Sequence, residues 1–140
     1  MPHLLVALFL LLSGCATTLT PTSEAKPVPL ARLFESQYFH RSDPQDIEVI
    51  VKRDQGFSGS GTGIMLHLDG KPVANLASGE IVRLYLPTGR YLLGVIPTIN
   101  LGSHSLQETE AVVTPDSSQI YRIHTGSGGD MAFHISRSSY

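Results

Sequence analysis

The chain has 140 residues, a length that allows one domain, and a formal net charge of −2. Charged side chains make up 16% of the residues, and because no basic face could neutralise a row of phosphates, we expect no nucleic-acid binding. The apolar content of 41% is too high for a disordered tail. Frequent glycine and proline, with 13 and 9 copies, favour a domain of short strands joined by tight turns.

An uninterrupted apolar run lies close to the N-terminus, at Leu4–Leu12. As a helix it would be roughly 13 Å long, whereas a bilayer core of about 30 Å needs roughly 20 residues. The run is too short for a permanent membrane span but suits the apolar core of a signal peptide, which we expect at residues 1–14. The preceding Met1-Pro2-His3 departs from the usual pattern, because it contains no lysine or arginine.

The next residues are Leu12-Ser13-Gly14-Cys15, and Cys15 is the only cysteine in the sequence. They resemble the lipobox of bacterial lipoproteins, in which a peptidase cuts before the cysteine and the thiol carries a diacylglyceryl group. The resemblance implies lipidation of Cys15 and a membrane anchor made of fatty acyl chains such as palmitate. By the sorting rules of Gram-negative lipoproteins, Ala16 in place of aspartate favours the outer membrane, with the domain facing the periplasm.

A proline- and threonine-rich stretch follows the cysteine and contains Pro21, Pro27 and Pro29. Prolines resist helix formation, and the stretch has few large apolar side chains to bury. We therefore expect residues 15–31 to form a flexible tether that holds the domain roughly 20–45 Å from the membrane.

The stretch from Arg32 to Asp46 is ambiguous. Leu33, Phe34, Tyr38 and Phe39 have near-helical spacing, and Ser42-Asp43-Pro44 then breaks the pattern. A short helix and a strand both fit. The aromatic side chains are expected to cover one end of the core, with a partner-docking stretch as the alternative.

The rest of the chain has the pattern of short β-strands. Ile47–Arg53 is rich in β-branched residues, and Ile64–Leu68 alternates between apolar and other side chains. Asp69-Gly70 predicts a two-residue hairpin turn into Lys71–Leu76, where Pro72 lacks an N–H donor and so favours a free sheet edge. Further strands are predicted at Gln107–Val113, Gln119–His124 and Met131–Ser136, the last with Met131, Phe133 and Ile135 inward.

A second hairpin is predicted where Glu80–Leu86 and Arg90–Ile96 flank Pro87-Thr88-Gly89. Both of its faces are largely apolar, so we expect it at the centre of the domain. The expected cross-strand partners are Tyr85 with Tyr91 and Leu84 with Leu92.

Together these segments predict an all-β fold for residues 32–140, a small antiparallel β-sandwich of about seven strands, with a small barrel as the alternative. One strand ends in Asp-Gly-Lys (69–71), a second ends in Pro-x-Gly (87–89), and the next carries Tyr91. Over Ile64–Ile96 this scheme resembles PEGA-type β-sandwich modules and related uncharacterised lipoproteins. Such modules are usually accessory envelope domains without known catalysis, so the resemblance implies an accessory role.

Motifs for catalysis are scarce. The glycine-rich Gly56–Gly63 lacks the Gly-Lys-Ser/Thr of a phosphate loop, and no Gly-x-Ser-x-Gly elbow occurs. His67, His124 and His134 fall on predicted strands and could meet as metal ligands, but solvated surface histidines explain them more simply. We expect no enzyme, no cofactor and no metal, with a small periplasmic metal-binding protein or hydrolase using these histidines as the alternative.

Four side chains are candidates for binding a partner. Ile99 and Leu101 lie in the predicted loop Pro97–Ser105, and apolar loop tips can contact partners. Tyr85 and Tyr91 form either a cross-strand pair or an aromatic binding face. The expected function is that of an accessory lipoprotein that binds another envelope component, either a protein or a glycan.

Overall fold

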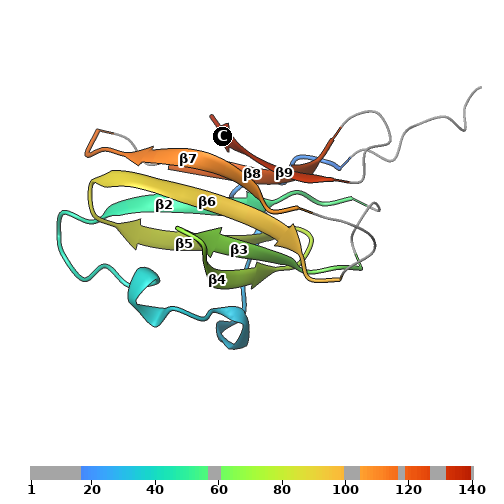
Figure 1. The fold of residues 1–140 in the computed structure, drawn as a ribbon, viewed down its shortest axis with the longest axis horizontal. Helices are drawn as coiled ribbons and strands as arrows, with labels where there is room; N and C mark the ends of the chain where they lie inside the picture. The colour runs from blue at the N-terminus through green and yellow to red at the C-terminus, as the bar shows by residue number, and fades with distance from the viewer. Residues whose placement is uncertain (1–16, 57–60, 100–104, 117–118, 127–131, 140) are drawn as a thin grey trace, which may run out of the picture.

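The computed structural model describes residues 17–56, 61–99, 105–116, 119–126 and 132–139, and its strands form two sheets packed face to face (Figure 1). One sheet has the order β1-β5-β2-β8-β9, formed by Lys26–Pro27, Glu80–Leu86, Ile47–Arg53, Gln119–Thr125 and Phe133–Ser138. The other has the order β4-β3-β6-β7, formed by Lys71–Leu76, Ile64–Leu68, Gly89–Pro97 and Gln107–Val113. The all-β sandwich is confirmed, with nine strands in the described residues.

The core lies between the two sheets and consists of every second residue of the strands. On β3, for example, Ile64, Leu66 and Leu68 are buried, while Met65 and His67 between them are partly exposed. Full burial of such a side chain contributes roughly 1.5–3 kcal/mol. Similar alternation brings in Val49 and Val51 of β2, Leu84 and Leu86 of β5, Leu93 and Val95 of β6, and Phe133 and Ile135 of β9.

The β3–β4 hairpin forms as predicted. Asp69 and Gly70 have φ angles of 49° and 79°, the left-handed values that the two-residue turn requires. Pro72 pairs with His67, and β4 is the outermost strand of its sheet. The edge is not free, however, because the Phe34 N–H donates to the Val73 carbonyl (2.9 Å) and thereby covers it.

The predicted hairpin of β5 and β6 is wrong. β5 pairs with β1 and β2, whereas β6 lies in the other sheet between β3 and β7, so Pro87 and Thr88 carry the chain from one sheet to the other. Tyr85 is paired with Glu48 and Tyr91 with Ala111, while Leu84 is paired with Val49 and Leu92 with Glu110. A short loop can close a hairpin or bridge two packed sheets. Because both strands are apolar on the core side, their sequences alone did not distinguish the two.

The sheet containing β2 is mixed and not purely antiparallel. β8 runs parallel to β2, and β1 runs parallel to β5. β8 follows β7, which belongs to the other sheet. A connection that crosses between sheets is not bound by the antiparallel geometry of a hairpin, so β8 can enter beside β2 in the parallel sense.

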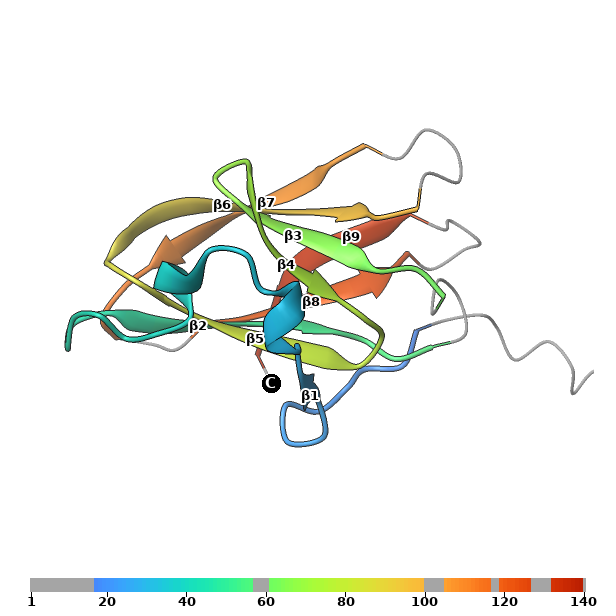
Figure 2. The same cartoon turned by 90° about the horizontal axis from the view of Figure 1, so that it is seen from below.

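Residues 30–39 form neither the single helix nor the strand considered above. They form two short 3₁₀ turns, η2 (Leu30–Arg32) and η3 (Ser36–Tyr38), which lie beside β4 and β5 and in front of these strands in Figure 2. Leu33, Tyr38 and Phe39 pack against the core. The prediction that aromatic side chains cover the core here is therefore confirmed for Tyr38 and Phe39.

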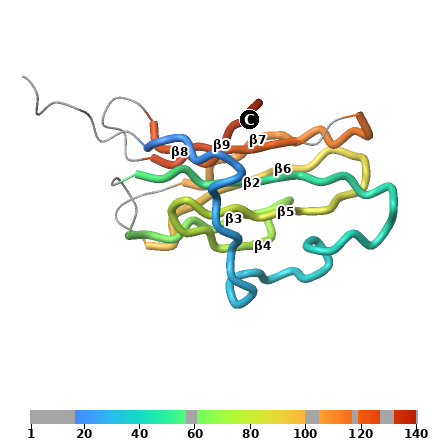
Figure 3. Tube along the Cα trace, turned by 180° about the vertical axis from the view of Figure 1, so that it is seen from behind, coloured from blue at the N-terminus to red at the C-terminus, as the bar shows by residue number. Residues whose placement is uncertain are grey.

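The described part of the expected tether, from Thr17 onward, is packed on the domain and is not a flexible spacer. Figure 3 shows this segment crossing the strands on the near side. The N–H groups of Lys26 and Val28 donate to Gly79 and Ile81 (both 3.0 Å), which adds β1 to the edge of β5. Pro27 stands between these donors, where its missing N–H leaves no ladder bond unmade. The prolines of this N-terminal segment therefore fit an edge strand.

Charged side chains at the end of β2 hold this segment down. The Asp54 side chain is completely buried and accepts from Arg122 Nε (2.6 Å) and, more weakly, from the Thr20 N–H (3.4 Å). Lys52 is also buried and donates to the Thr22 hydroxyl (3.4 Å). Burial lowers the pKa of Lys52, and Arg122 adds to this, whereas Asp54 opposes it. The N-terminal segment thus covers a set of desolvated charges.

We predict that Asp54→Asn destabilises the domain by on the order of 2–3 kcal/mol, because it leaves Arg122 and Lys52 without their buried counter-charge. Urea unfolding measures the change. The matched control is Glu110→Gln, which removes a carboxylate that pairs with Arg90 at 3.0 Å on the surface. That change should cost less than about 1 kcal/mol. Equal effects of the two substitutions would contradict a special role for the buried carboxylate.

Candidate functional site

The three histidines proposed as metal ligands do not come together. His124 and His134 are directly paired on β8 and β9, with ring centroids 5.9 Å apart, and His124 Nε2 lies 3.1 Å from the Ser136 hydroxyl. Their strands bury the neighbouring residues in the core, so both rings lie on the outer face of the five-stranded sheet. His67 lies on the outer face of the other sheet. In the described part of the chain, no three potential ligands are grouped for a metal ion.

The two tyrosines do not form a shared aromatic face. Tyr85 points outward from β5, where the Arg41 guanidinium lies 5.1 Å from its ring centroid and its hydroxyl is 3.4 Å from Glu48 Oε1. Tyr91 packs against the core, and its hydroxyl donates to the Pro87 carbonyl (2.9 Å). Burial raises the pKa of Tyr91. Tyr91 therefore braces the crossing between the sheets.

The apolar candidates are separated from the tyrosines. Ile99 follows the end of β6, whereas Tyr85 is close to the end of β5 and Tyr91 close to the start of β6. The start and the end of β6 lie at opposite ends of the sandwich. Leu101 and Cys15 fall outside the described residues. The described candidates for partner binding therefore do not form one surface.

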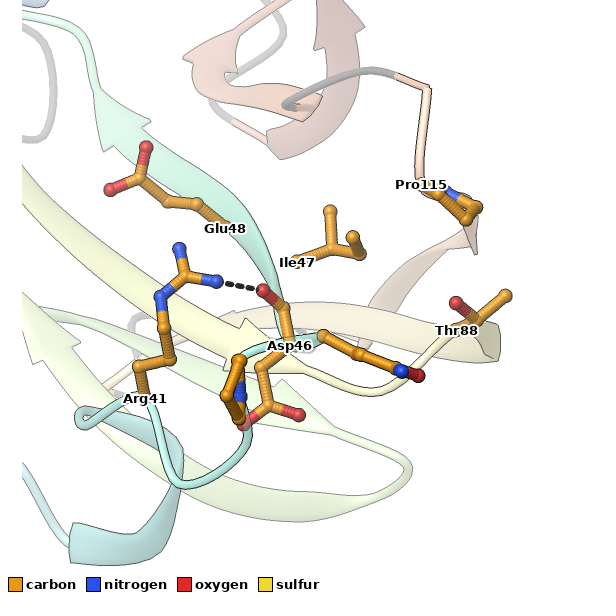
Figure 4. A pocket seen from close by; sticks show the side chains of 8 residues that line it. Arg41, Asp46, Ile47, Glu48, Thr88 and Pro115 are labelled. Carbon is orange, nitrogen blue, oxygen red and sulfur yellow. Dashed lines mark hydrogen bonds between the residues drawn. The ribbon is translucent and has the colours of Figure 1, made fainter.

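A shallow hollow of about 520 Å³ opens at the end of the sandwich where β2 begins and β5 ends (Figure 4). Its lining comes from three separate parts of the chain: the approach to β2, the crossing between β5 and β6, and the connection after β7. The lining residues are Arg41, Pro44, Gln45, Asp46, Ile47, Glu48, Thr88 and Pro115.

The wall formed by residues 41–46 is shaped by one carboxylate. Asp46 accepts hydrogen bonds from the Ser42 N–H (3.1 Å), the Asp43 N–H (3.0 Å) and the Ser42 hydroxyl (3.1 Å). Arg41 donates to the Asp46 backbone carbonyl. The backbone bond from Asp43 is the largest cause that lowers the pKa of Asp46, with help from Ser42 and Arg41. The wall is therefore a closed turn that holds Arg41 over the hollow.

The chemistry of the hollow suits recognition of a polar group. Arg41 supplies a planar cation, Thr88 a hydroxyl and Gln45 an amide, while Glu48 is already paired with Arg83 (3.2 Å). Among the described residues that line the hollow there is no histidine, cysteine or lysine. The lining therefore offers hydrogen-bond donors and acceptors together with charges of both signs.

Sequence reasoning missed this hollow. Arg41, Thr88 and Pro115 are far apart in the chain. They meet only because the chain crosses from the sheet of β5 to the sheet of β6 at Pro87 and Thr88. The break at Ser42-Asp43-Pro44 was visible, but nothing in the sequence placed it beside Thr88.

A scan against protein-family models, a search of curated proteins and a search of solved structures each found no match for this chain. The resemblance to lipoproteins and to PEGA-type modules therefore stays a prediction. Within the described ranges, no helix is long and apolar enough to cross a membrane.

We predict that the turn at residues 42–46 loses its hydrogen bonds in acid, when the Asp46 carboxylate is protonated. The pKa of Asp46 is held below its ordinary 3.8, so the stabilisation by the carboxylate is present above that pH and is lost as the pH falls through the lowered value. The amide signals of Ser42 and Asp43, followed by NMR, should move with a midpoint below 3.8.

The variant Asp46→Asn should remove this transition, whereas Asp43→Asn should leave the Ser42 signal titrating. A midpoint at or above the ordinary value would show that the carboxylate does not hold the turn.

Proposed function

We propose that this chain is an accessory lipoprotein of the bacterial envelope, anchored by lipid at Cys15, that binds another envelope component, protein or glycan, without catalysing a reaction. The observation that carries the proposal is Leu12-Ser13-Gly14-Cys15 directly after the apolar run Leu4–Leu12.

Several acyl chains at one residue anchor a protein firmly, since each buried CH₂ contributes about 0.8 kcal/mol. The residue after the cysteine is Ala16. In a Gram-negative host this favours the outer membrane, with the domain on the periplasmic side.

The hollow formed by residues 41–48, Thr88 and Pro115 is our candidate for the partner surface. It is open, lined by polar groups of mixed sign and built on a braced turn. The edge of β4 is a weaker candidate than the sequence suggested, because residues 32–34 already occupy it. His67 lies on a different sheet from His124 and His134, so these histidines give no support to a metal-dependent activity.

Cys15→Ser should abolish membrane retention in the native host, because the acyl chains would then have no thiol to receive them. The variant should be recovered as unprocessed precursor or in the soluble fraction. Wild-type protein purified from membranes should carry a diacylglyceryl group at Cys15, as measured by mass spectrometry. Ser13→Thr serves as the control, since it leaves the cysteine in place. A wild-type protein with an intact, unmodified N-terminus would overturn the proposal.

A photo-crosslinking residue at Thr88 should capture the partner in cells, since Thr88 lines the hollow. The matched control is the same residue at Leu92, which is exposed on the outer face of the other sheet. Crosslinked bands should appear at position 88 and be weak or absent at 92. Capture at 92 but not at 88 would move the partner surface away from the hollow.

A further inference from the structure

The connection between the proposed lipid anchor and the folded domain is very short. The Thr17 hydroxyl lies within hydrogen-bonding distance of the N–H (3.4 Å) and the hydroxyl (3.3 Å) of Thr125. Thr18 and Gln55 exchange two backbone hydrogen bonds of 2.5 and 3.1 Å. Ala16 alone separates Thr17 from Cys15. Two extended residues span at most about 7 Å, far less than the 20–45 Å expected of a free tether.

The contact at Thr17 is close as well as hydrogen-bonded. A Cβ atom added to Gly56 would lie 2.9 Å from the Thr17 Cα, a distance at which the backbone of one of them would have to move. Glycine at position 56 therefore lets the N-terminal segment lie directly on the end of β2. The place where the chain leaves the domain is set by backbone packing.

That place belongs to one end of the sandwich, which we call the loop end: the end where β2, β6 and β8 finish and β3, β7 and β9 begin (Figure 1). Among its described residues it exposes Ile99 (46%) and Leu106 (38%), and the exposed charged side chain at its border is Lys26, whose backbone N–H donates to the Gly79 carbonyl. The described residues of the loop end are 17–18, 55–56, 61–63, 77–79, 97–99, 105–106, 125–126 and 132.

The opposite end, which contains the hollow, is rich in charge. Arg41, Asp43, Arg90, Asp116 and Arg137 are all exposed in this half of the sandwich. It also exposes Leu92 (45%) and Val112 (41%), so the two ends differ in charge and not in exposed apolar side chains. Charged groups are costly to bring into a lipid interface, whereas threonine, glycine and single apolar side chains are not. The two ends therefore differ in the surroundings that they can tolerate.

We infer that, when Cys15 is lipidated as proposed above, the loop end rests against the lipid surface with Ile99 and Leu106 at the headgroup boundary, and the hollow points away from the membrane. β6 has nine residues and spans roughly 30 Å at about 3.4 Å per residue, which sets the approximate height of the hollow above the lipid. The partner surface is thus held at a fixed distance and orientation.

Lipid-borne quenchers test this orientation in the full lipidated protein. Cys15 is the only native cysteine and its thiol is acylated, so an introduced cysteine is the single site for a fluorescent label. The protein is reconstituted into phosphatidylethanolamine–phosphatidylglycerol vesicles that carry nitroxide lipids. Labels on Ile99→Cys and Leu106→Cys should lose most of their emission, whereas labels on Thr88→Cys and Asp116→Cys should keep most of theirs. Equal quenching at the two ends, or the reverse order, overturns the inference.

A longer linker between Cys15 and the domain provides the second measurement. A Gly/Ser insertion of ten residues after Ala16 would allow a separation of roughly 17 Å, so quenching at position 99 should fall. Unchanged quenching would show that the short connection does not set the orientation.

Failure of this inference is distinguishable from failure of the proposed function. Mass spectrometry and vesicle flotation of the same preparation report lipidation. An unmodified, non-floating protein removes both proposals, whereas a lipidated, floating protein that is quenched equally at both ends removes the orientation alone.

Discussion

The structure depends on how the end of β2 accommodates three consecutive charges. Side chains alternate along a strand, so Arg53 follows Val49 and Val51 into the core while Lys52 faces outward. Buried charges destabilise a fold unless they are paired or hydrogen-bonded. Arg53 donates to the carbonyls of Thr62 (2.7 Å) and Leu76 (2.8 Å) and lies 5.0 Å from the centroid of the Phe133 ring. Burial lowers the pKa of Arg53 to about 10, which still leaves it charged at neutral pH.

The N-terminal segment completes this arrangement and closes two sheet edges. It covers Lys52 and Asp54, adds β1 to the side of β5, and then reaches the edge of β4 through Phe34. Between these edges Arg32 forms two bonds to the Glu80 carboxylate (2.5 and 2.8 Å) and one to the Asn75 carbonyl (2.9 Å). Glu80 raises the pKa of Arg32. Open strand edges invite pairing with other chains, so a segment that ties both sheets together also protects them.

Local patterns predicted the strands well but not their partners. Ile64–Leu68 and Gln107–Val113 begin and end as predicted, because alternation and turn residues act over a few neighbouring positions. The sheet to which β5 belongs depends on which apolar face meets which, and β5 is buried at five of its seven positions, so its pattern allowed either sheet.

The tether was misjudged for a related reason: a proline at an edge and a proline in a free spacer look the same in sequence. Arg53 could have been found, since its phase with Val49 and Val51 already placed it inward. The hollow could not, because it requires the crossing at Pro87.

These features together make the two ends of the sandwich unequal. In the described residues, the end that receives Thr17 carries glycine, threonine, serine, Ile99 and Leu106, with Lys26 at its border, while the other end carries arginines, aspartates and the turn closed by Asp46. A long flexible tether would make this difference irrelevant to presentation, because the domain could then tumble freely above the membrane. When Cys15 is lipidated as we propose, a connection of about 7 Å removes that freedom, since the domain then cannot rotate without lifting its own N-terminal segment from Gly56 and Thr125. The packing that stabilises the buried charges of β2 is therefore also what would set the direction in which the hollow faces.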